Sequence, residues 1–277
     1  PLENGLKSIS LSANWMWPCN NEGENARLYK AVEAASDFAV ALGINIPTGK
    51  DSLSMKQKYA EQEVLSPGTV IISAAGHCND FTKAVEPVFK PGKGKLFYIN
   101  LSADSFKLGG SSFAQTQNKI GSTTPSILND QAFKETFDWI QNQIKAGNIA
   151  AGHDVASGGL ITTLLEGCFA EIALGAEINL SALSDQSLIE VLFSENAGVI
   201  LQATDQGFDH IAKDCPLPCI EIGSVTTEPR VKINYHHVEI GLEIERLRSV
   251  WFETSYLFDK HQTANSLAEV RYHNLGK

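Results

Sequence analysis

One polar segment combines the residue types needed to hold a metal-bound phosphate. In PTGKDSLSMK, residues 47–56, Gly49 interrupts an alternating strand pattern and is followed directly by Lys50, Asp51 and Ser52. A strand glycine allows a ligand to approach the backbone closely, while lysine can meet a phosphate and aspartate can hold Mg²⁺. The spacing differs from that of a Walker A loop. The segment predicts a metal–nucleotide site of another kind, with an exposed turn at a strand end as the open alternative.

A second polar segment, GHDVASGGL at residues 152–160, joins a short apolar run to a helical pattern. Backbone amides at a helix start favour an anion, and the carboxylate of Asp154 can hold the metal counter-ion of that anion. Asp154 or Ser157 could instead cap the helix, and the local pattern leaves both interpretations open.

Two further segments could contact phosphate or substrate. In LGGSSFAQ, residues 108–115, Gly109, Gly110 and Ser111 precede a helical stretch, an arrangement in which backbone N–H groups form an anion nest. In LFSENAGVILQ, residues 192–202, Glu195 lies in a polar break between two apolar runs. Ordinary turns remain the alternative for both segments.

The composition restricts the class of partner. The 277 residues include 22 basic and 32 acidic side chains, for a formal net charge of -10. This balance repels a phosphate backbone, and no basic cluster overrides the repulsion, so nucleic acid is not an expected partner. The positive field around a small phosphorylated ligand must then come from backbone amides or metal ions. No apolar run approaches the ~20 residues that span a bilayer, so no membrane association is expected.

The cysteines indicate a reducing compartment. There are five, an odd number spread thinly over a long chain, which fits the cytoplasm better than a disulfide framework. Cys215 and Cys219 precede His236 and His237, but the CPLPC spacing matches no common zinc site, and buried thiols are frequent core residues. We therefore expect no metal site there.

Hydrophobic periodicity predicts three strands and one long helix in the first third of the chain. Strand patterns cover residues 8–16, 44–55 and 69–75, and apolar positions recur on one helical face over residues 25–42. The densest cluster of proline and glycine, at residues 87–94, marks a domain boundary near residue 90.

Beyond this boundary, strands and helices alternate. Helical patterns cover residues 133–144, 161–172 and 243–261, and strand patterns cover residues 96–101, 149–151, 188–193, 199–203, 219–222 and 231–235. This order indicates an α/β or α+β fold, with domains at residues 1–90 and 91–261. The tail, residues 262–277, lacks periodicity and is expected to be a linker.

The order of these segments resembles the large, single-chain phosphoribosylformylglycinamidine synthases. Eight segments follow the order and approximate spacing of that family almost from end to end: LSANWMW, GENARLYKAV, LGINIPTGKDSLSMK, SPGTVIISA, LGGSSFAQ, GHDVASGGL, LFSENAGVILQ and VWFETSYLFDKHQ. The resemblance implies an aminoimidazole ribonucleotide synthase-like fold, in which two halves pair through their first domains into a shared β-barrel. It also implies a fragment from the second half of the synthase domain, and Pro1, with no initiator Met before it, fits an excised piece.

The resemblance implies an ATP-dependent carbon–nitrogen ligase of purine biosynthesis. In this family ATP, formylglycinamide ribonucleotide and glutamine give formylglycinamidine ribonucleotide, ADP, phosphate and glutamate. ATP phosphorylates the amide oxygen, ammonia displaces the phosphate, and Mg²⁺ supplies much of the positive charge. By the same resemblance, the glutaminase domain, the first synthase half and the first strand and helix of the domain at residues 1–90 are missing partners. The fragment alone is therefore not expected to turn over.

The resemblance also implies site residues on the matching positions, none of them with an assigned catalytic role. ATP or ADP contacts are expected at Gly49, Lys50, Asp51, Ser52 and Ser157, phosphate or substrate contacts at Gly109, Gly110, Ser111 and Glu195, and Mg²⁺ ligands at Asp51 and Asp154. The sequence departs from the family at Ala156, where relatives usually carry a nucleotide-contacting serine, with Ser157 displaced by one residue.

Other functions and assemblies stay open. This half could serve as a nucleotide-stabilised scaffold and docking surface, with catalysis concentrated in the missing half. The chain could also be another ATP-using member of the same fold, such as a selenophosphate synthetase or thiamine-phosphate kinase, although those lack the SANW and FETSY segments. An exposed barrel edge invites pairing, so a homodimer is a further expectation.

Overall fold

The computed structural model describes residues 1–275, with the backbone alone at residues 208 and 209. By its internal contacts the chain separates into two compact units, which are residues 1–84 with 129–145 and residues 85–128 with those from 146 onward. The first break lies close to the expected boundary near residue 90. The division differs from the expected domains in one respect, because helix α3 (Asp130–Ala146) groups with the first unit.

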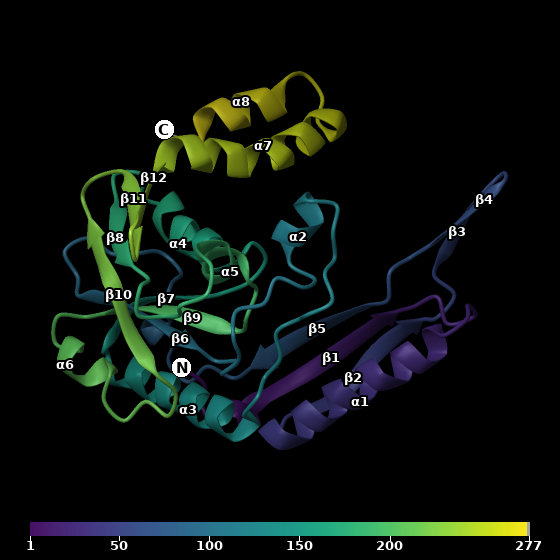
Figure 1. Ribbon diagram of the computed structural model, residues 1–277, viewed down its shortest axis with the longest axis horizontal. Helices are drawn as coiled ribbons and strands as arrows, with labels where there is room; N and C mark the ends of the chain where they lie inside the picture. Colours follow the sequence, from purple (N-terminus) through teal and green to yellow (C-terminus); the bar gives the residue numbers. More distant parts are fainter. Residues whose placement is uncertain (276–277) are drawn as a thin grey trace. The chain divides into compact units, whose positions relative to one another are not determined.

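A three-stranded sheet with the order β2-β1-β5 forms the centre of the first unit (Figure 1). β1 (Ile9–Met16) pairs in parallel with β2 (Asn45–Ser52) and antiparallel with β5 (Thr69–Gly76). α1 (Glu24–Leu42) provides the crossover that a parallel pair requires, and it ends at Gly43, whose φ of 72° suits a left-handed C-cap. The helix and the three strands predicted here are confirmed.

Short elements and α3 complete the first unit. They are η1 (Gly5–Ser8), η2 (Phe81–Lys83) and a separate hairpin of β3 (Lys56–Tyr59) with β4 (Gln62–Leu65). Phe133 of α3 packs edge-on against Phe38 of α1, with the ring centroids 5.4 Å apart. Gln141 of α3 accepts a hydrogen bond from the N–H of Leu2. These contacts explain why α3 belongs with residues that lie far away in the sequence.

The second unit is built on a seven-stranded mixed sheet with the order β12-β11-β8-β10-β6-β9-β7. β8 and β11 pair in parallel, and the other neighbouring strands run antiparallel. The strands are β6 (Lys95–Asn100), β7 (Ile149–Asp154), β8 (Gly175–Asn179), β9 (Gly198–Ala203), β10 (Cys219–Thr226), β11 (Arg230–Tyr235) and β12 (Val238–Glu243). Both units mix helices with sheets, and the predicted α/β class is confirmed.

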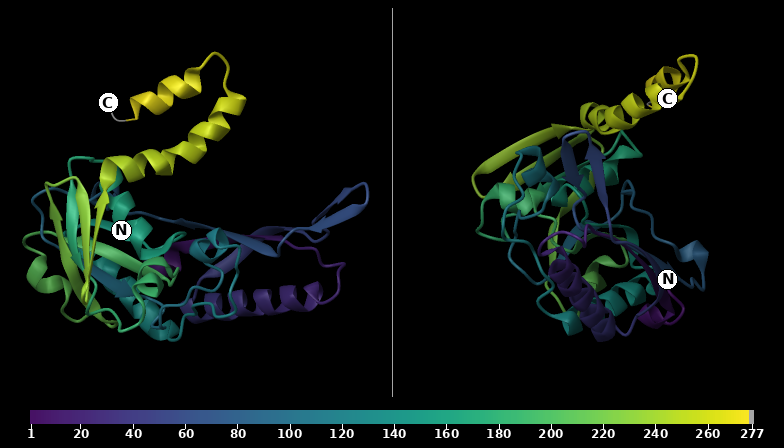
Figure 2. Two further views of the ribbon diagram at one scale, coloured as in Figure 1. Left: turned by 45° about the horizontal axis from the view of Figure 1, so that its top comes forward. Right: turned by 90° about the vertical axis from the view of Figure 1, so that its right-hand side faces the viewer.

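Helix α4 (Gly159–Phe169) lies at the centre of the hydrophobic core of the second unit. Its Leu160, Leu164 and Cys168 are buried, and it contacts both α5 (Leu188–Phe193) and α7 (Ile244–Gln262). The remaining helices are α2 (Ser112–Thr116), α6 (Phe208–Ile211) and α8 (Leu267–Asn274). Figure 2 shows α7 and α8 as a helical hairpin. A helix so firmly packed fixes the loop that precedes it.

Two local expectations need correction. Residues 188–193 are the helix α5 and not a strand, because Ser187 and Glu190 form a reciprocal capping box that starts a helical turn. The tail expected to be an irregular linker contains α8. There Tyr272 stacks on Tyr256 of α7 at 4.5 Å between ring centroids, and Arg271 pairs with Asp259 at 2.6 Å. Residues 276 and 277 of that tail lie outside the described residues.

Candidate functional site

The GKDS segment forms the end of β2 in the first unit. Gly49 lies opposite Ala13 of β1, and a Cβ at Gly49 would come within 2.0 Å of the Ala13 carbonyl oxygen, so the strands pair here only with glycine. Side chains alternate along a strand, which puts Lys50 and Ser52 on one face and Asp51 on the other. Lys50 Nζ donates to Ser52 Oγ at 2.9 Å. The structure brings Lys50 and Ser52 together, and it directs Asp51 away from them.

The glycine loop of the second unit, residues 108–112, makes internal hydrogen bonds where the sequence suggested a free anion nest. Gly109 N–H donates to the carbonyl of Thr123 at 2.9 Å, and Gly110 N–H donates to that of Ile120 at 2.6 Å. Ser111 N–H donates back to Leu108, and its hydroxyl caps α2 by accepting from Ala114 N–H. The amides of Gly109, Gly110 and Ser111 are therefore already engaged.

Glu195 joins the glycine loop to the α4 entry loop, residues 155–159. Its Oε1 accepts one hydrogen bond from the N–H of Ser112 at 2.7 Å and another from the N–H of Gly158 at 2.8 Å. Gly158 is the N-cap of α4 and has a φ of 90°, a conformation that favours glycine. A carboxylate at this end of the helix also interacts favourably with the helix dipole. Glu195 thus occupies the position that the sequence assigned to a ligand anion.

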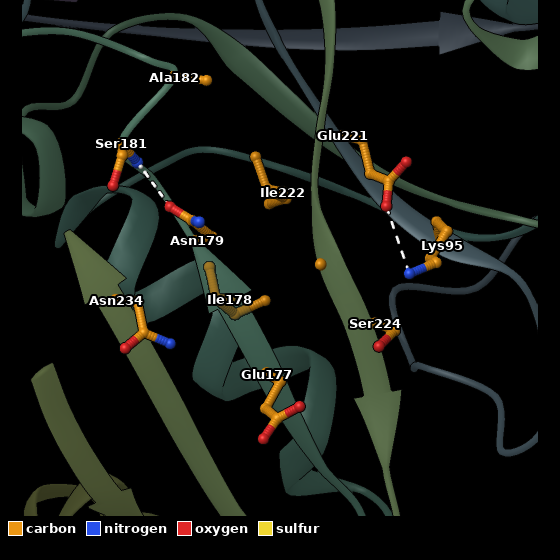
Figure 3. A pocket seen from close by; sticks show the side chains of 11 residues that line it. Lys95, Glu177, Ile178, Asn179, Ser181, Ala182, Glu221, Ile222, Ser224 and Asn234 are labelled. Atoms are coloured by element: carbon orange, nitrogen blue, oxygen red, sulfur yellow. Dashed lines mark hydrogen bonds and ion pairs between the residues drawn. The ribbon is translucent and has the colours of Figure 1, made fainter. Parts of the chain in front are cut away.

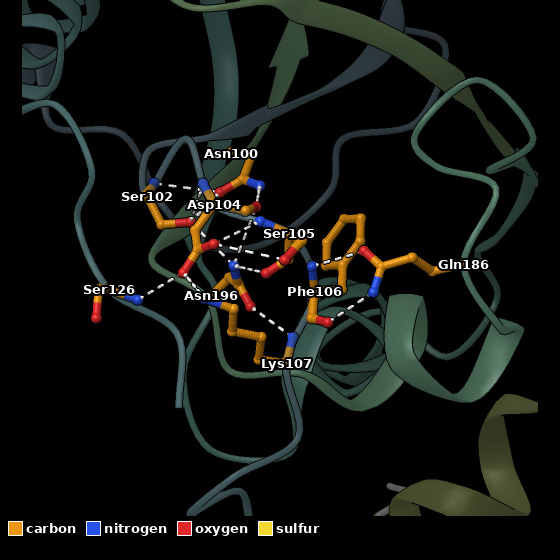
Figure 4. Close-up of polar contacts among 9 residues, drawn as sticks. All are labelled: Asn100, Ser102, Asp104, Ser105, Phe106, Lys107, Ser126, Gln186 and Asn196. Atoms are coloured by element: carbon orange, nitrogen blue, oxygen red, sulfur yellow. Dashed lines mark hydrogen bonds and ion pairs between the residues drawn. The ribbon is translucent and has the colours of Figure 1, made fainter. Parts of the chain in front are cut away.

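Asn196, the next residue, anchors the neighbouring loop at residues 100–107. It is almost fully buried, and its Nδ2 donates to Ser102 Oγ at 2.9 Å and to the Ser105 carbonyl at 3.0 Å. Figure 4 shows this network together with Asp104, which accepts from Lys107 Nζ at 2.6 Å. Glu195 and Asn196 therefore hold three loops together: the glycine loop, the α4 entry loop and the loop at residues 100–107. Sequence reasoning missed this role for Asn196.

The charge on Asp104 is held by its hydrogen bonds. Burial disfavours the carboxylate form, but donation by Lys107 Nζ and by the amides of Ser126 and Ser105 outweighs it, so the pKa of Asp104 lies below its usual range. The carboxylate is ionised at neutral pH and fixes the start of this loop.

Asp154 lies at the end of β7, and its side chain is 81% exposed. His153 connects it to the core: its Nδ1 lies 3.5 Å from Asp154 Oδ1, and its Nε2 shares a hydrogen bond of 3.1 Å with Glu166 of α4. Glu166 also accepts from the indole N–H of Trp251 on α7 at 3.2 Å. Asp154 therefore stands on a firmly held strand end with its carboxylate directed to solvent. Ser157, three residues on, is exposed in the α4 entry loop.

The exposed carboxylate of Asp154 fits one position in a magnesium site. Among the side chains that the structure describes, no three of the His, Cys, Asp and Glu type gather closely enough to hold a metal ion. An ion at Asp154 would therefore take its other oxygen ligands from water or from a bound phosphate, which is the usual coordination of Mg²⁺ beside a nucleotide.

Several cavities lie in the second unit, and two of them differ in their relation to the predicted site residues. One of about 430 Å³ borders the glycine loop and is lined by Gly109, Phe113 and Lys119, among others. Another, of about 580 Å³, lies over β8 and β10 and includes the ion pair of Lys95 with Glu221, 3.3 Å apart (Figure 3). No predicted site residue lines the larger cavity. The glycine loop is thus the place where a predicted residue and a cavity coincide.

The fold and the order of these loops agree with known families. The model of the FGAR-AT PurM_N-like domain matches residues 2–77, and that of the AIR synthase related protein, C-terminal domain, matches residues 101–236. The chain thus contains one region similar to each of these two domain families. No helix within residues 1–275 is long and apolar enough to cross a membrane.

Two longer proteins are similar to nearly the whole chain. The chain is 34% identical over 98% of its length to the probable phosphoribosylformylglycinamidine synthase, chloroplastic/mitochondrial, of Arabidopsis thaliana. It is 33% identical over 94% of its length to the phosphoribosylformylglycinamidine synthase of Homo sapiens. It spans 20% of the length of each. The chain is thus homologous to a segment of phosphoribosylformylglycinamidine synthase, and the predicted resemblance is confirmed.

Solved structures support the same fold. The chain matches Thermotoga maritima PurL in complex with ATP at a TM-score of 0.61, with 16% identity, covering 88% of this chain and 38% of that one. The complex of the same protein with FGAR gives a TM-score of 0.63, with 16% identity over 86% of this chain and 39% of that one. Hydrogenase maturation protein HypE matches at 0.59, with 13% identity over 86% of this chain and 78% of that one.

Proposed function

We propose that the chain is part of an ATP-dependent carbon–nitrogen ligase that converts formylglycinamide ribonucleotide to formylglycinamidine ribonucleotide. The observation that carries this proposal is 34% identity over 98% of the chain to an enzyme bearing that name. PurL of Thermotoga maritima, which has the same fold, is known in complexes with ATP, with ADP and with FGAR. The chain corresponds to a fifth of its relatives, so the glutaminase and the other synthase half are proposed partners from the remaining length.

In this proposal the α4 entry loop and the strand end before it receive a nucleotide. Asp154, with its exposed carboxylate, would hold a Mg²⁺ ion, which would supply positive charge for phosphoryl transfer. Ser157 lies at the same end of α4 and donates to the nucleotide. Lys50 and Ser52, which are hydrogen-bonded to each other on β2, meet phosphate in the assembled enzyme. Glu195 keeps the two loops at a fixed separation without touching the ligand.

A second candidate function is a scaffold that holds a nucleotide without turnover. The observation that favours it is the internal hydrogen bonding of the glycine loop, where Gly109, Gly110 and Ser111 donate to protein carbonyls. A loop so fully bonded suits a stable platform better than one that must reshape around a reacting phosphate. In this case catalysis takes place in the parts of the enzyme that lie outside this chain.

The test is separate Asp51→Asn and Asp154→Asn substitution in the full-length enzyme that contains this segment. Catalytic use predicts a loss of ADP formation per folded molecule, with the unfolding midpoint unchanged. Scaffold use predicts near-normal turnover per folded molecule and lower stability. Asp185→Asn is the matched control, because Asp185 is fully exposed and distant in sequence from these loops. If the unmodified full-length enzyme formed no ADP with formylglycinamide ribonucleotide and glutamine, the proposed activity would be wrong.

The compartment and the assembly remain proposals. We keep the cytoplasm as the expected compartment, although the Arabidopsis relative is named for chloroplast and mitochondrion.

β5 is an edge strand of the first unit, and its Val70, Ile71 and Ile72 are exposed. Such an edge favours pairing with another strand, either from the missing half or from a second copy. Sedimentation of the purified chain distinguishes a homodimer from a monomer.

A further inference from the structure

A carboxylate on α4 links the end of β7 to α7. Glu166 has both of its side-chain oxygens engaged: Oε2 lies 3.1 Å from Nε2 of His153 on β7, and Oε1 accepts from the indole N–H of Trp251 on α7 at 3.2 Å. Trp251 also packs on Phe169, the last residue of α4, with 5.9 Å between the ring centroids. The Glu166 side chain is therefore held from both sides.

His153 has one ring nitrogen with a hydrogen-bond partner and one without. Its side chain is 18% exposed, and among the described residues its Nδ1 is buried without a hydrogen-bond partner. Oδ1 of Asp154 lies 3.5 Å from Nδ1 and forms no hydrogen bond with it. The Asp154 side chain is 81% exposed, so its carboxylate is free to turn towards solvent or towards the ring. A buried polar atom without a partner is uncommon in folded proteins and marks His153 as a constrained residue.

The partner of Nε2 determines which ring nitrogen carries the proton. An ionised carboxylate only accepts hydrogen bonds, and Glu166 already accepts one from Trp251, whose indole N–H only donates. Nε2 of His153 is then the donor to Glu166, which in a neutral ring leaves Nδ1 with a lone pair. A lone pair cannot donate to the carboxylate of Asp154, so the ring leaves that carboxylate unbound.

We propose that Glu166 is a positioning residue for Asp154: it holds His153 in the Nε2–H tautomer and so keeps the Asp154 carboxylate free to bind a cation. In the other tautomer, Nδ1–H would donate to Oδ1 of Asp154 after a small rotation of that exposed side chain. The carboxylate would then be engaged by a fixed donor and would bind a cation less tightly. The tautomer of His153 is independent of the proposed function, and only the binding of a cation at Asp154 rests on it.

Glu166→Gln should reverse the tautomer without changing the size of the side chain. The amide offers one acceptor oxygen and one donor NH₂ group in place of two acceptors. Because Trp251 can only donate, the amide oxygen should face Trp251 and the NH₂ group should face Nε2 of His153. Nε2 must then accept, the proton moves to Nδ1, and Nδ1–H donates to Asp154.

The first experiment determines the tautomer by NMR of the purified chain, labelled with ¹⁵N-histidine and held at about pH 8. The chain has 7 histidines, and His153→Gln identifies the signals of His153. The ¹⁵N shifts distinguish the two neutral tautomers from each other and from the imidazolium. We expect Nε2–H in the wild type and Nδ1–H in Glu166→Gln. Adding Trp251→Phe to Glu166→Gln should restore Nε2–H, because the amide oxygen can then turn to His153.

The second experiment measures cation binding with Mn²⁺ alone, which prefers the same oxygen ligands as Mg²⁺ and broadens nearby NMR signals. We expect Mn²⁺ to broaden the signals of His153 beside Asp154. Glu166→Gln should need about tenfold more Mn²⁺ for the same broadening, and the double variant should return towards the wild type. Glu171→Gln, at an exposed position just beyond α4, is the control and should match the wild type in both experiments.

The outcomes separate this inference from the proposed function. A proton on Nδ1 of wild-type His153, or a doubly protonated ring, would overturn the inference whatever the chain binds. Equal Mn²⁺ requirements in the wild type and Glu166→Gln would overturn it as well, and would leave Asp154 as a proposed metal position. No broadening of His153 in the wild type would contradict the metal position at Asp154 itself, and with it the cation-binding part of the inference.

Discussion

Glu195 accepts a hydrogen bond from the N–H of Gly158 at 2.8 Å, so a carboxylate of the protein itself lies at the N-terminus of α4. The same oxygen accepts from Ser112 of the glycine loop. Free amides at such a helix end would attract phosphate, and here Glu195 satisfies one of them. This arrangement gives Glu195 a role in positioning the two loops, and its contact with a ligand stays a prediction.

Glu195→Ala should free the glycine loop and the α4 entry loop from each other, while Glu195→Gln should largely hold them in place. Alanine leaves the amides of Ser112 and Gly158 without their acceptor, and we expect a loss of about 2 kcal/mol in the free energy of unfolding. Glutamine retains a carbonyl oxygen and should lose about half as much. Urea denaturation measures the energies, and amide hydrogen exchange at Ser112 and Gly158 reports the loops directly. Glu239→Ala, at an exposed position of β12, is the control and should change neither quantity.

The nucleotide affinity of the same two variants shows whether Glu195 only positions the loops or also contacts the ligand. If Glu195 only positions the loops, glutamine should restore the binding of a non-hydrolysable ATP analogue that alanine weakens. Equal weakening in both variants, with normal amide exchange in the glutamine variant, would show that the carboxylate touches the ligand or its metal.

Gly49→Ala should destabilise the first unit. The added methyl group would lie 2.0 Å from the Ala13 carbonyl oxygen, a clash between backbones that side-chain rotation cannot relieve. Overpacking of this kind costs about 2 kcal/mol or more. Gly241→Ala is the matched strand control, because its methyl group would lie 3.4 Å from Arg230 Cδ at an exposed position. Thermal or urea unfolding compares the two, and equal stability of both variants would contradict the close β1–β2 approach.

Ser187→Ala should weaken the start of α5. Ser187 Oγ accepts from the N–H of Glu190, and the Glu190 carboxylate accepts from the N–H of Ser187, so alanine removes one half of the capping box. Loss of such a cap costs about 1 kcal/mol. Ser187→Asp keeps an acceptor at the same position and should retain most of the stability. The free energy of unfolding in urea measures both variants, and identical losses would mean that the cap contributes nothing here.

A comparison of α1 with α5 shows why the sequence predicted some elements correctly and not others. Long periodic patterns such as residues 25–42 were predicted correctly, because one apolar face repeated over many turns is a strong signal. The run at residues 188–193 is too short for its periodicity to separate helix from strand. The capping box at Ser187 and Glu190 was present in the sequence and would have decided it.

Site geometry was harder to predict than the fold. The sequence identified both glycine-rich loops and Glu195, but it gave no sign that Glu195 would satisfy amides from both of them. Hydrogen bonds between residues 83 and 37 positions apart leave no local pattern. The alternation of Lys50, Asp51 and Ser52 along β2 could have been predicted, since it follows from strand periodicity once the strand is assigned.

Asp104→Asn should reduce stability at neutral pH, and the effect should fade in acid. The hydrogen bonds from Lys107, Ser126 and Ser105 hold the pKa of Asp104 below its unfolded value of about 3.9. A depressed pKa stabilises the fold fully above the unfolded value and loses that contribution as the pH falls through the folded one. We expect asparagine to lower the free energy of unfolding by about 2 kcal/mol at pH 7, because the partly buried ion pair with Lys107 loses its anion. The difference from wild type should stay constant above about pH 5 and shrink below about pH 4.

The control for Asp104 is Glu86→Gln, which removes an exposed pair with Lys90 in the same unit. Exposed pairs contribute little, so this variant should match wild type at every pH. Urea unfolding of wild type and both variants between pH 3 and pH 7 makes the comparison. A difference for Asp104→Asn that does not change with pH would mean that packing, and not the ionised carboxylate, links Asp104 to its loop.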